Sequence, residues 1–139
     1  MSKRVDVFFY GSFMRPEVMV QAGFTPDTVQ VAQLHGYDIC LDPHANVFPS
    51  PMHSVFGIVV QASHAELDRL YSVRGAGCFL PEAALVTGAD GRWLPVMCYM
   101  PPSRGNQPAD QPYLARLIEA AEHRGLPREY IARLQSYAH

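Results

Sequence analysis

Residues 5–14 read Val-Asp-Val-Phe-Phe-Tyr-Gly-Ser-Phe-Met, and this stretch decides the fold that the chain is expected to adopt. Five of its first six residues are apolar, and most of these are β-branched or aromatic, which is typical of a strand buried on both faces. Gly11 then permits a tight turn or a close approach of the main chain that a Cβ atom would block. Arg15-Pro16-Glu17 follows as the start of a helix, with Pro16 at its first position.

A junction of this kind can hold an anion. Main-chain N–H groups at the start of a helix have no partner within it, and they can bind a carboxylate or a phosphate. The same residues also suit an ordinary tight turn between a strand and a helix. The stretch alone leaves both interpretations open.

The composition is that of one globular domain. The chain has 139 residues, of which 48% are hydrophobic and 17% charged, so residues 1–139 can form a single domain with its own core. A net charge of −2, with both signs interspersed, gives no electrostatic reason to expect a nucleic acid or an anionic membrane as partner. No apolar run approaches about 20 residues, and the N-terminus does not resemble a signal sequence, so we expect a cytoplasmic protein.

The cysteines do not indicate a disulfide framework or a zinc site. Cys40, Cys78 and Cys98 are odd in number, widely separated and without a Cys-x-x-Cys pair. They suit small core positions, although Cys78 lies in a glycine-rich turn and is also a candidate nucleophile. The chain has no dinucleotide fingerprint, P-loop or metal-binding cluster, so we expect no cofactor and no metal.

Periodicity and turn residues give the expected order of elements. Serine and glutamate at Ser63 and Glu66 form a capping box, Gly57 marks a close approach within a core strand, and Asp90-Gly91 indicates a hairpin. The three prolines of segment 42–53 predict a loop. The expected helices are 17–22, 63–71, 113–124 and 129–137, and the expected strands are 5–10, 29–34, 37–41, 54–60, 83–87 and 93–100. This order favours an α+β domain with a closed or strongly curved sheet.

With these segments in place, the chain resembles the γ-glutamylcyclotransferase-like family, in particular its AIG2-like branch. The matching stretches occur in the family's order and cover nearly the whole chain. They are Tyr10-Gly11-Ser12-Phe13-Met14 with Arg15-Pro16-Glu17, the loop 49–51 leading into Ser54-Val55-Phe56-Gly57, the helix 63–70, and the ending Tyr113-Leu114 with Gly125-Leu126-Pro127-Arg128-Glu129-Tyr130.

The resemblance implies a γ-glutamylcyclotransferase-like small mixed β-barrel with flanking helices and a cavity at the mouth of the first turn. In the family, the Tyr-Gly-Ser main chain holds the α-carboxylate and α-amino ends of a γ-glutamyl substrate, and the reaction releases 5-oxoproline and a free amine. The resemblance therefore implies a small molecule with a carboxylate as the partner. It assigns substrate binding to Tyr10, Gly11, Ser12 and Phe13, with Tyr113 as a further candidate.

One position departs from the family. Its members carry a glutamate that acts as general acid and base, because the attacking amine must lose a proton and the leaving amine must gain one. In Leu70-Tyr71-Ser72-Val73-Arg74-Gly75, the register places Arg74 where that glutamate belongs. An arginine cannot exchange protons near neutral pH, because its pKa stays above about 12.

Three interpretations follow from Arg74. Another carboxylate can fill the acid–base role: Glu82 is the nearest one downstream in the sequence, and Asp68 and Glu66 precede Arg74 on the expected helix. Alternatively, the pocket survives with a different activity, in which Arg74 binds an acidic ligand or one of the loop residues His44, His53 and Cys78 carries the chemistry. The third interpretation is a relative of the family that serves protein contacts, since one fold can host unrelated functions.

Overall fold

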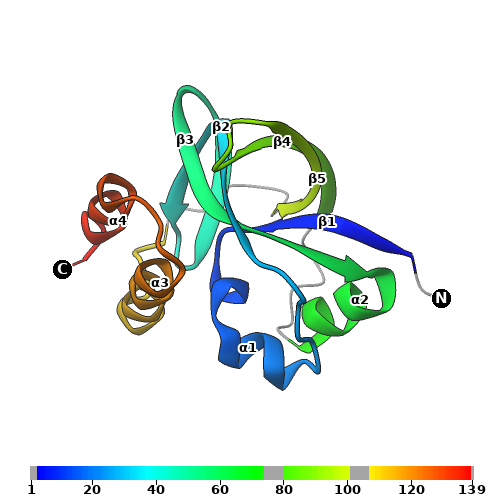
Figure 1. Ribbon diagram of the computed structural model, residues 1–139. Coiled ribbons are helices and arrows are strands. Elements are labelled where there is room, and N and C mark those ends of the chain that lie inside the picture. Colours follow the sequence, from blue (N-terminus) through cyan, green and yellow to red (C-terminus); the bar gives the residue numbers. More distant parts are fainter. Residues whose placement is uncertain (1–2, 74–79, 101–106, 139) are drawn as a thin grey trace.

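The computed structural model describes residues 3–73, 80–100 and 107–138. Its strands form the upper part of the molecule in Figure 1, with α1 and α2 below them and α3 and α4 to one side. The elements in chain order are β1 (Arg4–Phe9), the 3-10 helix η1 (Ser12–Met14), α1 (Pro16–Gln21), β2 (Gln30–Leu41), β3 (Ala45–Ser63), α2 (His64–Val73), β4 (Leu80–Gly88), β5 (Trp93–Met100), α3 (Gln111–Arg124) and α4 (Arg128–Gln135).

The strands close into a barrel in the order β1-β3-β2-β4-β5, which confirms the predicted fold class. Neighbouring strands are antiparallel except at the closure, where β1 and β5 run parallel and Val7 lies opposite Met97. Parallel strands need a connection that returns to the same end of the sheet, and here the rest of the barrel provides it. The ends of β1 and β5 therefore meet at the same mouth of the barrel.

The first strand is buried as its sequence predicts. Val7, Phe8 and Phe9 are each at most 2% exposed, so side chains on both faces of β1 are covered. β1 pairs along its whole length with β3, from Arg4 opposite Ser63 to Phe9 opposite Ile58. β1 is therefore an interior strand of the barrel and fixes the position of the turn that follows it.

The predicted close approach at Gly57 is confirmed. A Cβ atom on this residue would lie 2.2 Å from the main-chain oxygen of Phe9 and 2.9 Å from the ring of Phe8. Real Cβ atoms do not come so close to a main-chain oxygen, so glycine is required for β3 to cross the end of β1 at this distance.

The prediction of a loop over residues 42–53 holds for residues 42–44 but is wrong for residues 45–53. Ala45–Ser63 is one strand, and Gln30–Leu41, expected as two strands, is one as well. The two pair on both sides of an irregularity, where His35 lies opposite Ser54 but Tyr37 opposite Pro49. Pro51 lies within the unpaired residues 50–53, and Pro49, opposite Tyr37, lies at their edge. Both prolines are exposed, so their missing N–H groups fall where the ladder is interrupted or begins again.

The helix ends follow the local sequence signals. The Ser63 N–H donates to Glu66 Oε1 at 2.8 Å, and the Glu66 N–H donates to Ser63 Oγ at 3.2 Å, which confirms the capping box of α2. At α3, the Asp110 carboxylate accepts from the Tyr113 N–H at 3.0 Å, and Gly125 ends the helix with φ of 78°. None of the helices in the described ranges has the length and hydropathy needed to cross a membrane.

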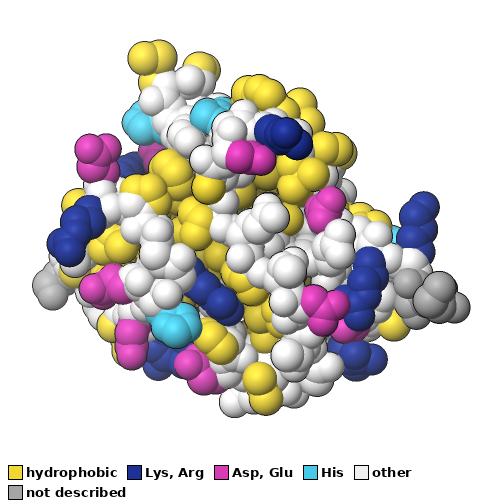
Figure 2. All heavy atoms as spheres, viewed as in Figure 1, with side chains coloured by type: hydrophobic (Ala, Val, Ile, Leu, Met, Phe, Trp, Pro, Cys, Tyr) yellow, Lys and Arg dark blue, Asp and Glu magenta, His cyan; other side chains and the backbone are white. Residues whose placement is uncertain are grey.

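The barrel wall remains partly apolar toward solvent. Figure 2 shows hydrophobic side chains gathered in the upper part of the molecule, where the strands lie, while charged side chains are spread around the lower part. Leu80, Leu85 and Trp93 on β4 and β5 are each more than half exposed. The helices therefore leave part of the β4–β5 face of the barrel uncovered.

Candidate functional site

The turn after β1 is a single turn of 3-10 helix that leads directly into α1. The Met14 N–H donates to the Gly11 oxygen, and the Arg15 N–H donates to the Ser12 oxygen, each at 3.0 Å. Pro16 then occupies the first position of α1, as predicted. The main-chain N–H groups of Ser12 and Phe13 stand at the start of η1, where a helix offers them no internal acceptor.

The structure brings Tyr113 to this turn. A Cβ atom on Gly11 would lie 3.1 Å from the Tyr113 hydroxyl oxygen and 3.4 Å from Cβ of Ala45. The same hydroxyl accepts a hydrogen bond from the Ala45 N–H at 3.2 Å, which holds it in place between the two segments. Two residues that are distant in sequence, Gly11 and Tyr113, therefore form one corner of the candidate site.

His44 lies beside Tyr113, at the turn between β2 and β3. The two rings are 4.4 Å apart between centroids, and His44 Nε2 lies 3.7 Å from Asp110 Oδ2. The Asp110 N–H in turn donates to the Pro43 oxygen at 3.1 Å. These contacts tie the start of α3 to the β2–β3 turn, so the position of Tyr113 depends on both segments.

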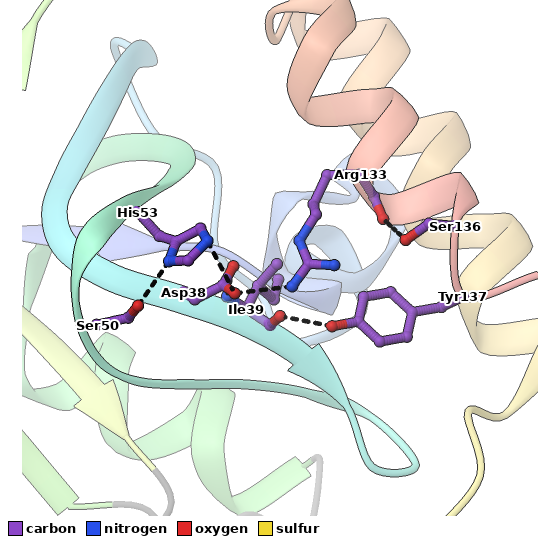
Figure 3. Close-up of polar contacts among 7 residues, drawn as sticks. All are labelled: Asp38, Ile39, Ser50, His53, Arg133, Ser136 and Tyr137. Atoms are coloured by element: carbon purple, nitrogen blue, oxygen red, sulfur yellow. Dashed lines mark hydrogen bonds and ion pairs between the residues drawn. The ribbon is translucent and has the colours of Figure 1, made fainter.

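His53 belongs to a different cluster. Figure 3 shows His53 and Arg133 approaching Asp38 from opposite sides. Arg133 donates to Asp38 Oδ2 at 2.7 Å, His53 Nε2 lies 4.0 Å from the same oxygen, and Ser50 Oγ lies 2.6 Å from His53 Nδ1. The charge of Asp38 is thus paired with Arg133, and this cluster fastens α4 to the barrel.

The Tyr10 side chain links the end of β1 to β5, where the barrel closes. It is 5% exposed, and its hydroxyl donates to the Tyr99 oxygen at 2.9 Å. Burial, with smaller contributions from Cys98 and Tyr113, raises the pKa of Tyr10 well above its ordinary value. Its hydroxyl stays protonated and engaged, so the main chain is what Tyr10 can offer to a ligand.

Phe13 is likewise a packing residue. It is 7% exposed, and its ring lies edge-on to those of Phe9 and Tyr71, with centroids 5.4 and 4.8 Å away. Tyr71 also stacks on Tyr99 at 4.0 Å. Burial first, and then Tyr10 and Cys98, raise the pKa of Tyr71 strongly. Tyr71 carries no functional signal in the sequence, because a tyrosine at the end of an amphipathic helix is typical of an ordinary core residue.

Glu82 lies at the same mouth of the barrel. It is the cross-strand partner of Cys98, whose other neighbour across the sheet is Phe8 on β1. Cross-strand partners point to the same face, so Glu82 projects on the side where Cys98 is buried, although Glu82 itself is exposed. Because neighbouring strands are about 4.8 Å apart, the main chains of Glu82 and Phe8 are separated by about 10 Å.

Cys98 is a core thiol. It is fully buried, and burial together with the nearby charge of Glu82 raises the pKa of Cys98 to about 12. The thiol therefore stays protonated near neutral pH and lacks the thiolate character of a nucleophile. Cys40 is also buried, and its thiol donates to Asp42 Oδ2 at 3.4 Å.

Two predicted candidates, Arg74 and Cys78, lie outside the described residues. In the part of the chain that the structure describes, no group of three or more His, Cys, Asp or Glu residues is arranged to hold a metal ion.

Residues 54–134 match the model of the AIG2-like family. No curated protein sequence matches the chain.

Among solved structures, the chain is similar to a gamma-glutamyl cyclotransferase with 20% identity and a TM-score of 0.81, covering 96% of this chain and 88% of that one. It is also similar to the uncharacterized protein loc79017 from Homo sapiens, with 21% identity, a TM-score of 0.79 and coverage of 96% and 87%. A third is a gamma-glutamyl cyclotransferase specific to glutathione from yeast, with 14% identity, a TM-score of 0.63 and coverage of 100% and 98%. At these identities the likeness to the three structures establishes the fold.

Proposed function

The chain belongs to the AIG2-like family, and from that premise we propose that it is an enzyme that acts on γ-glutamyl amines or related amides. The reaction would release 5-oxoproline and a free amine. Two of the solved structures that share the fold are gamma-glutamyl cyclotransferases, which supports this choice of chemistry.

The turn after β1 is the proposed binding site for the α-carboxylate of the substrate. The first N–H groups of η1, on Ser12 and Phe13, carry partial positive charge and have no acceptor within the helix. Gly11 allows the Tyr113 hydroxyl to lie close to this turn, because a Cβ atom on Gly11 would stand 3.1 Å from that hydroxyl oxygen. Tyr113 then lies where a hydroxyl can contact a ligand bound at the turn.

The proposed reaction is an internal acyl transfer. The α-amine loses a proton and attacks the γ-carbonyl carbon, a new C–N bond closes the five-membered ring, and the bond to the departing amine breaks. The proton taken from the α-amine is delivered to the departing amine, so the reaction needs neither water nor an oxidant. A carboxylate that first accepts and then donates the proton is sufficient.

We assign this acid–base role to Glu82. The single observation that carries the proposal is the register of Glu82. It lies opposite Cys98, which lies opposite Phe8, and Phe8 is four residues before Ser12 in the proposed carboxylate site. A glutamate side chain extending from a main chain about 10 Å from β1 can reach a substrate held at the mouth of the barrel.

The test is the release of 5-oxoproline. Purified protein is incubated with a panel of γ-glutamyl amines and γ-glutamyl dipeptides, and the product is quantified by mass spectrometry. We expect Glu82→Gln to lower kcat by about 100-fold or more with little change in KM, the usual size of a general acid–base contribution. Glu129→Gln, an exposed carboxylate on α4, is the matched control and should leave kcat unchanged.

Two outcomes would contradict the proposal. If Glu82→Gln retains full activity, another group transfers the proton. If the wild-type protein binds glutamate or a γ-glutamyl compound but forms no product from any member of the panel, the chain is a ligand-binding relative that has lost the reaction.

A further inference from the structure

Four aromatic rings form a continuous row that passes the turn at η1. The rings of Phe9 and Phe13 lie edge-on, with centroids 5.4 Å apart, and Phe13 and Tyr71 lie edge-on at 4.8 Å. Tyr71 then stacks on Tyr99, with centroids 4.0 Å apart and the ring planes 24° apart. Edge-on and stacked rings attract each other beyond the burial of their surface, so each ring of this aromatic row helps to hold its neighbours.

Tyr71 is the member of the aromatic row that α2 contributes. Phe9 ends β1, Phe13 belongs to η1, and Tyr99 belongs to β5. The first two elements follow each other in the chain, and β1 pairs with β5 in the barrel wall. The Tyr71 ring therefore joins the last turn of α2 to the turn at η1 on one side and to the barrel on the other.

The turn at η1 depends on packing for its shape. It is a single turn of 3-10 helix, a form with weaker hydrogen-bond geometry than an α-helix, and Gly11 at its start supplies no capping side chain. Phe13 is 7% exposed, and its ring is held by Phe9 on β1 and by Tyr71 on α2. Because the Phe13 N–H belongs to the proposed carboxylate site, a shift of this ring would also move a donor of that site.

We propose that Tyr71 is a positioning residue for the carboxylate site, whose ring fixes the N–H groups of Ser12 and Phe13 before the ligand binds. Donors that are already in place spare the ligand the cost of ordering them. This inference rests on the carboxylate site of the proposed function. Burial raises the pKa of Tyr71 strongly, so its hydroxyl stays neutral and the ring, rather than a proton transfer, performs the role.

Binding of L-glutamate tests the inference without requiring turnover. The Kd is measured by calorimetry on the full-length protein, and NMR follows the main-chain amides of Ser12 and Phe13 during the same titration. In the wild type we expect both amide signals to shift. Tyr71→Leu should raise the Kd about tenfold, the cost of ordering side chains that the wild type holds in place.

Two matched variants separate positioning from general stability. Tyr71→Phe keeps the ring, so its Kd should stay within about twofold of the wild-type value. Phe56→Leu removes a ring pair of the same kind, since Phe56 lies edge-on to Tyr130 at 5.4 Å between β3 and α4. This variant should unfold at a lower temperature but leave the Kd unchanged. Circular dichroism melting establishes that each variant is folded.

Kinetics give a second readout on any γ-glutamyl compound that the wild type converts. Because the carboxylate contact is made equally in the ground state and the transition state, Tyr71→Leu should raise KM about tenfold with little change in kcat. Four outcomes would overturn the inference: no glutamate binding to the wild type, unshifted amides of Ser12 and Phe13, an unchanged Kd in Tyr71→Leu, or equal weakening in Phe56→Leu. A wild type that binds glutamate but releases no 5-oxoproline contradicts the proposed reaction alone, and a raised Kd in Tyr71→Leu then still supports the role of the ring.

Discussion

Glu82 and Cys98 lie directly opposite each other on β4 and β5, a charged residue at the mouth of the barrel beside a thiol with no solvent exposure. The first consequence concerns pH. Burial and the charge of Glu82 raise the pKa of Cys98 from 9.0 to about 12 in the folded protein. The stability that comes from keeping this thiol neutral is fully present below pH 9 and is lost as the pH rises toward 12, because only the unfolded chain releases the proton.

We therefore expect the free energy of unfolding, measured by urea denaturation, to fall between pH 9 and 10, before the unfolded-state tyrosines ionise. Cys98→Ala should show a shallower fall over the same interval. Cys40→Ala, which removes another buried thiol, is the control. An identical pH dependence in wild type and Cys98→Ala would contradict this prediction.

The contact between Gly11 and Tyr113 predicts coupling between the two residues. Gly11→Ala places a methyl group 3.1 Å from the Tyr113 hydroxyl, so we expect a loss of about 1 kcal/mol in stability. Tyr113→Phe removes the oxygen that the new methyl group meets, but it also removes the acceptor of the Ala45 N–H. The double variant should therefore lose less than the sum of the two single losses, by about 0.5 kcal/mol or more. Strict additivity in a double-mutant cycle would show that the two sites are independent.

Gly57 should be the less tolerant glycine of β3 and β4. In Gly57→Ala the new Cβ meets the main-chain oxygen of Phe9 at 2.2 Å, which two packed strands cannot relieve without separating. We expect a destabilisation of about 3 kcal/mol or more, or failure to fold. In Gly88→Ala the nearest atom, 3.3 Å away, is the side-chain oxygen of Asp90, which can rotate away. Thermal unfolding of the two variants should differ clearly, and similar melting temperatures would contradict the close approach.

The ion pair between Asp38 and Arg133 should anchor α4. Burial opposes the charge of Asp38, but hydrogen bonds from Arg133 and the Ile39 N–H outweigh it and hold the pKa of Asp38 below its usual value. This contribution is present above the ordinary aspartate pKa and is lost as the pH falls through the folded value. Arg133→Gln leaves a buried carboxylate poorly paired, which should cost about 2 kcal/mol after allowance for the partial exposure of Arg133.

Hydrogen exchange localises this effect. We expect faster exchange of the amides of α4 in Arg133→Gln, since the Asp38–Arg133 contact joins that helix to β2 (Figure 3). Arg128→Gln, an exposed arginine at the start of the same helix, is the control. Equal exchange rates of the α4 amides in the two variants would mean that the apolar face of α4 alone holds this helix in place.

Arg74→Glu tests the one position at which the sequence departs from the family's pattern. The substitution restores the family's acid–base residue at the position that the register assigns to it, so we expect 5-oxoproline release to rise above the wild-type rate. The measurement uses the same γ-glutamyl panel as the test of Glu82. A folded variant without increased activity would show that the site has diverged at more than this one position.

Local sequence signals predicted most of the elements. The junction of β1, η1 and α1 follows from an apolar run, a glycine and a proline in fixed order, and the capping box at Ser63 and Glu66 is confirmed atom by atom. The close approach at Gly57 was also predictable, because a glycine within a core strand has few other reasons to be there.

The long-range arrangement could not be predicted in the same way. Pro49 and Pro51 indicated a loop, because proline is rare inside a paired strand. That β3 is interrupted at these residues follows only from its pairing with β2, which the local sequence does not reveal. The register of Glu82 with Cys98 and the stacking of Tyr71 on Tyr99 likewise exist only after the barrel has closed. Side-chain periodicity carries no information on which strands become neighbours.

The parallel seam between β1 and β5 has a consequence for synthesis on the ribosome. Val7 leaves the ribosome well before its partner across the seam, Met97, which is made only after β2, β3 and β4. Until then the nascent chain exposes an apolar, hydrogen-bonding edge on its first strand, the type of surface on which chains aggregate. A chaperone that shields the edges of unpaired strands would therefore bind at this edge and would be released when β5 docks.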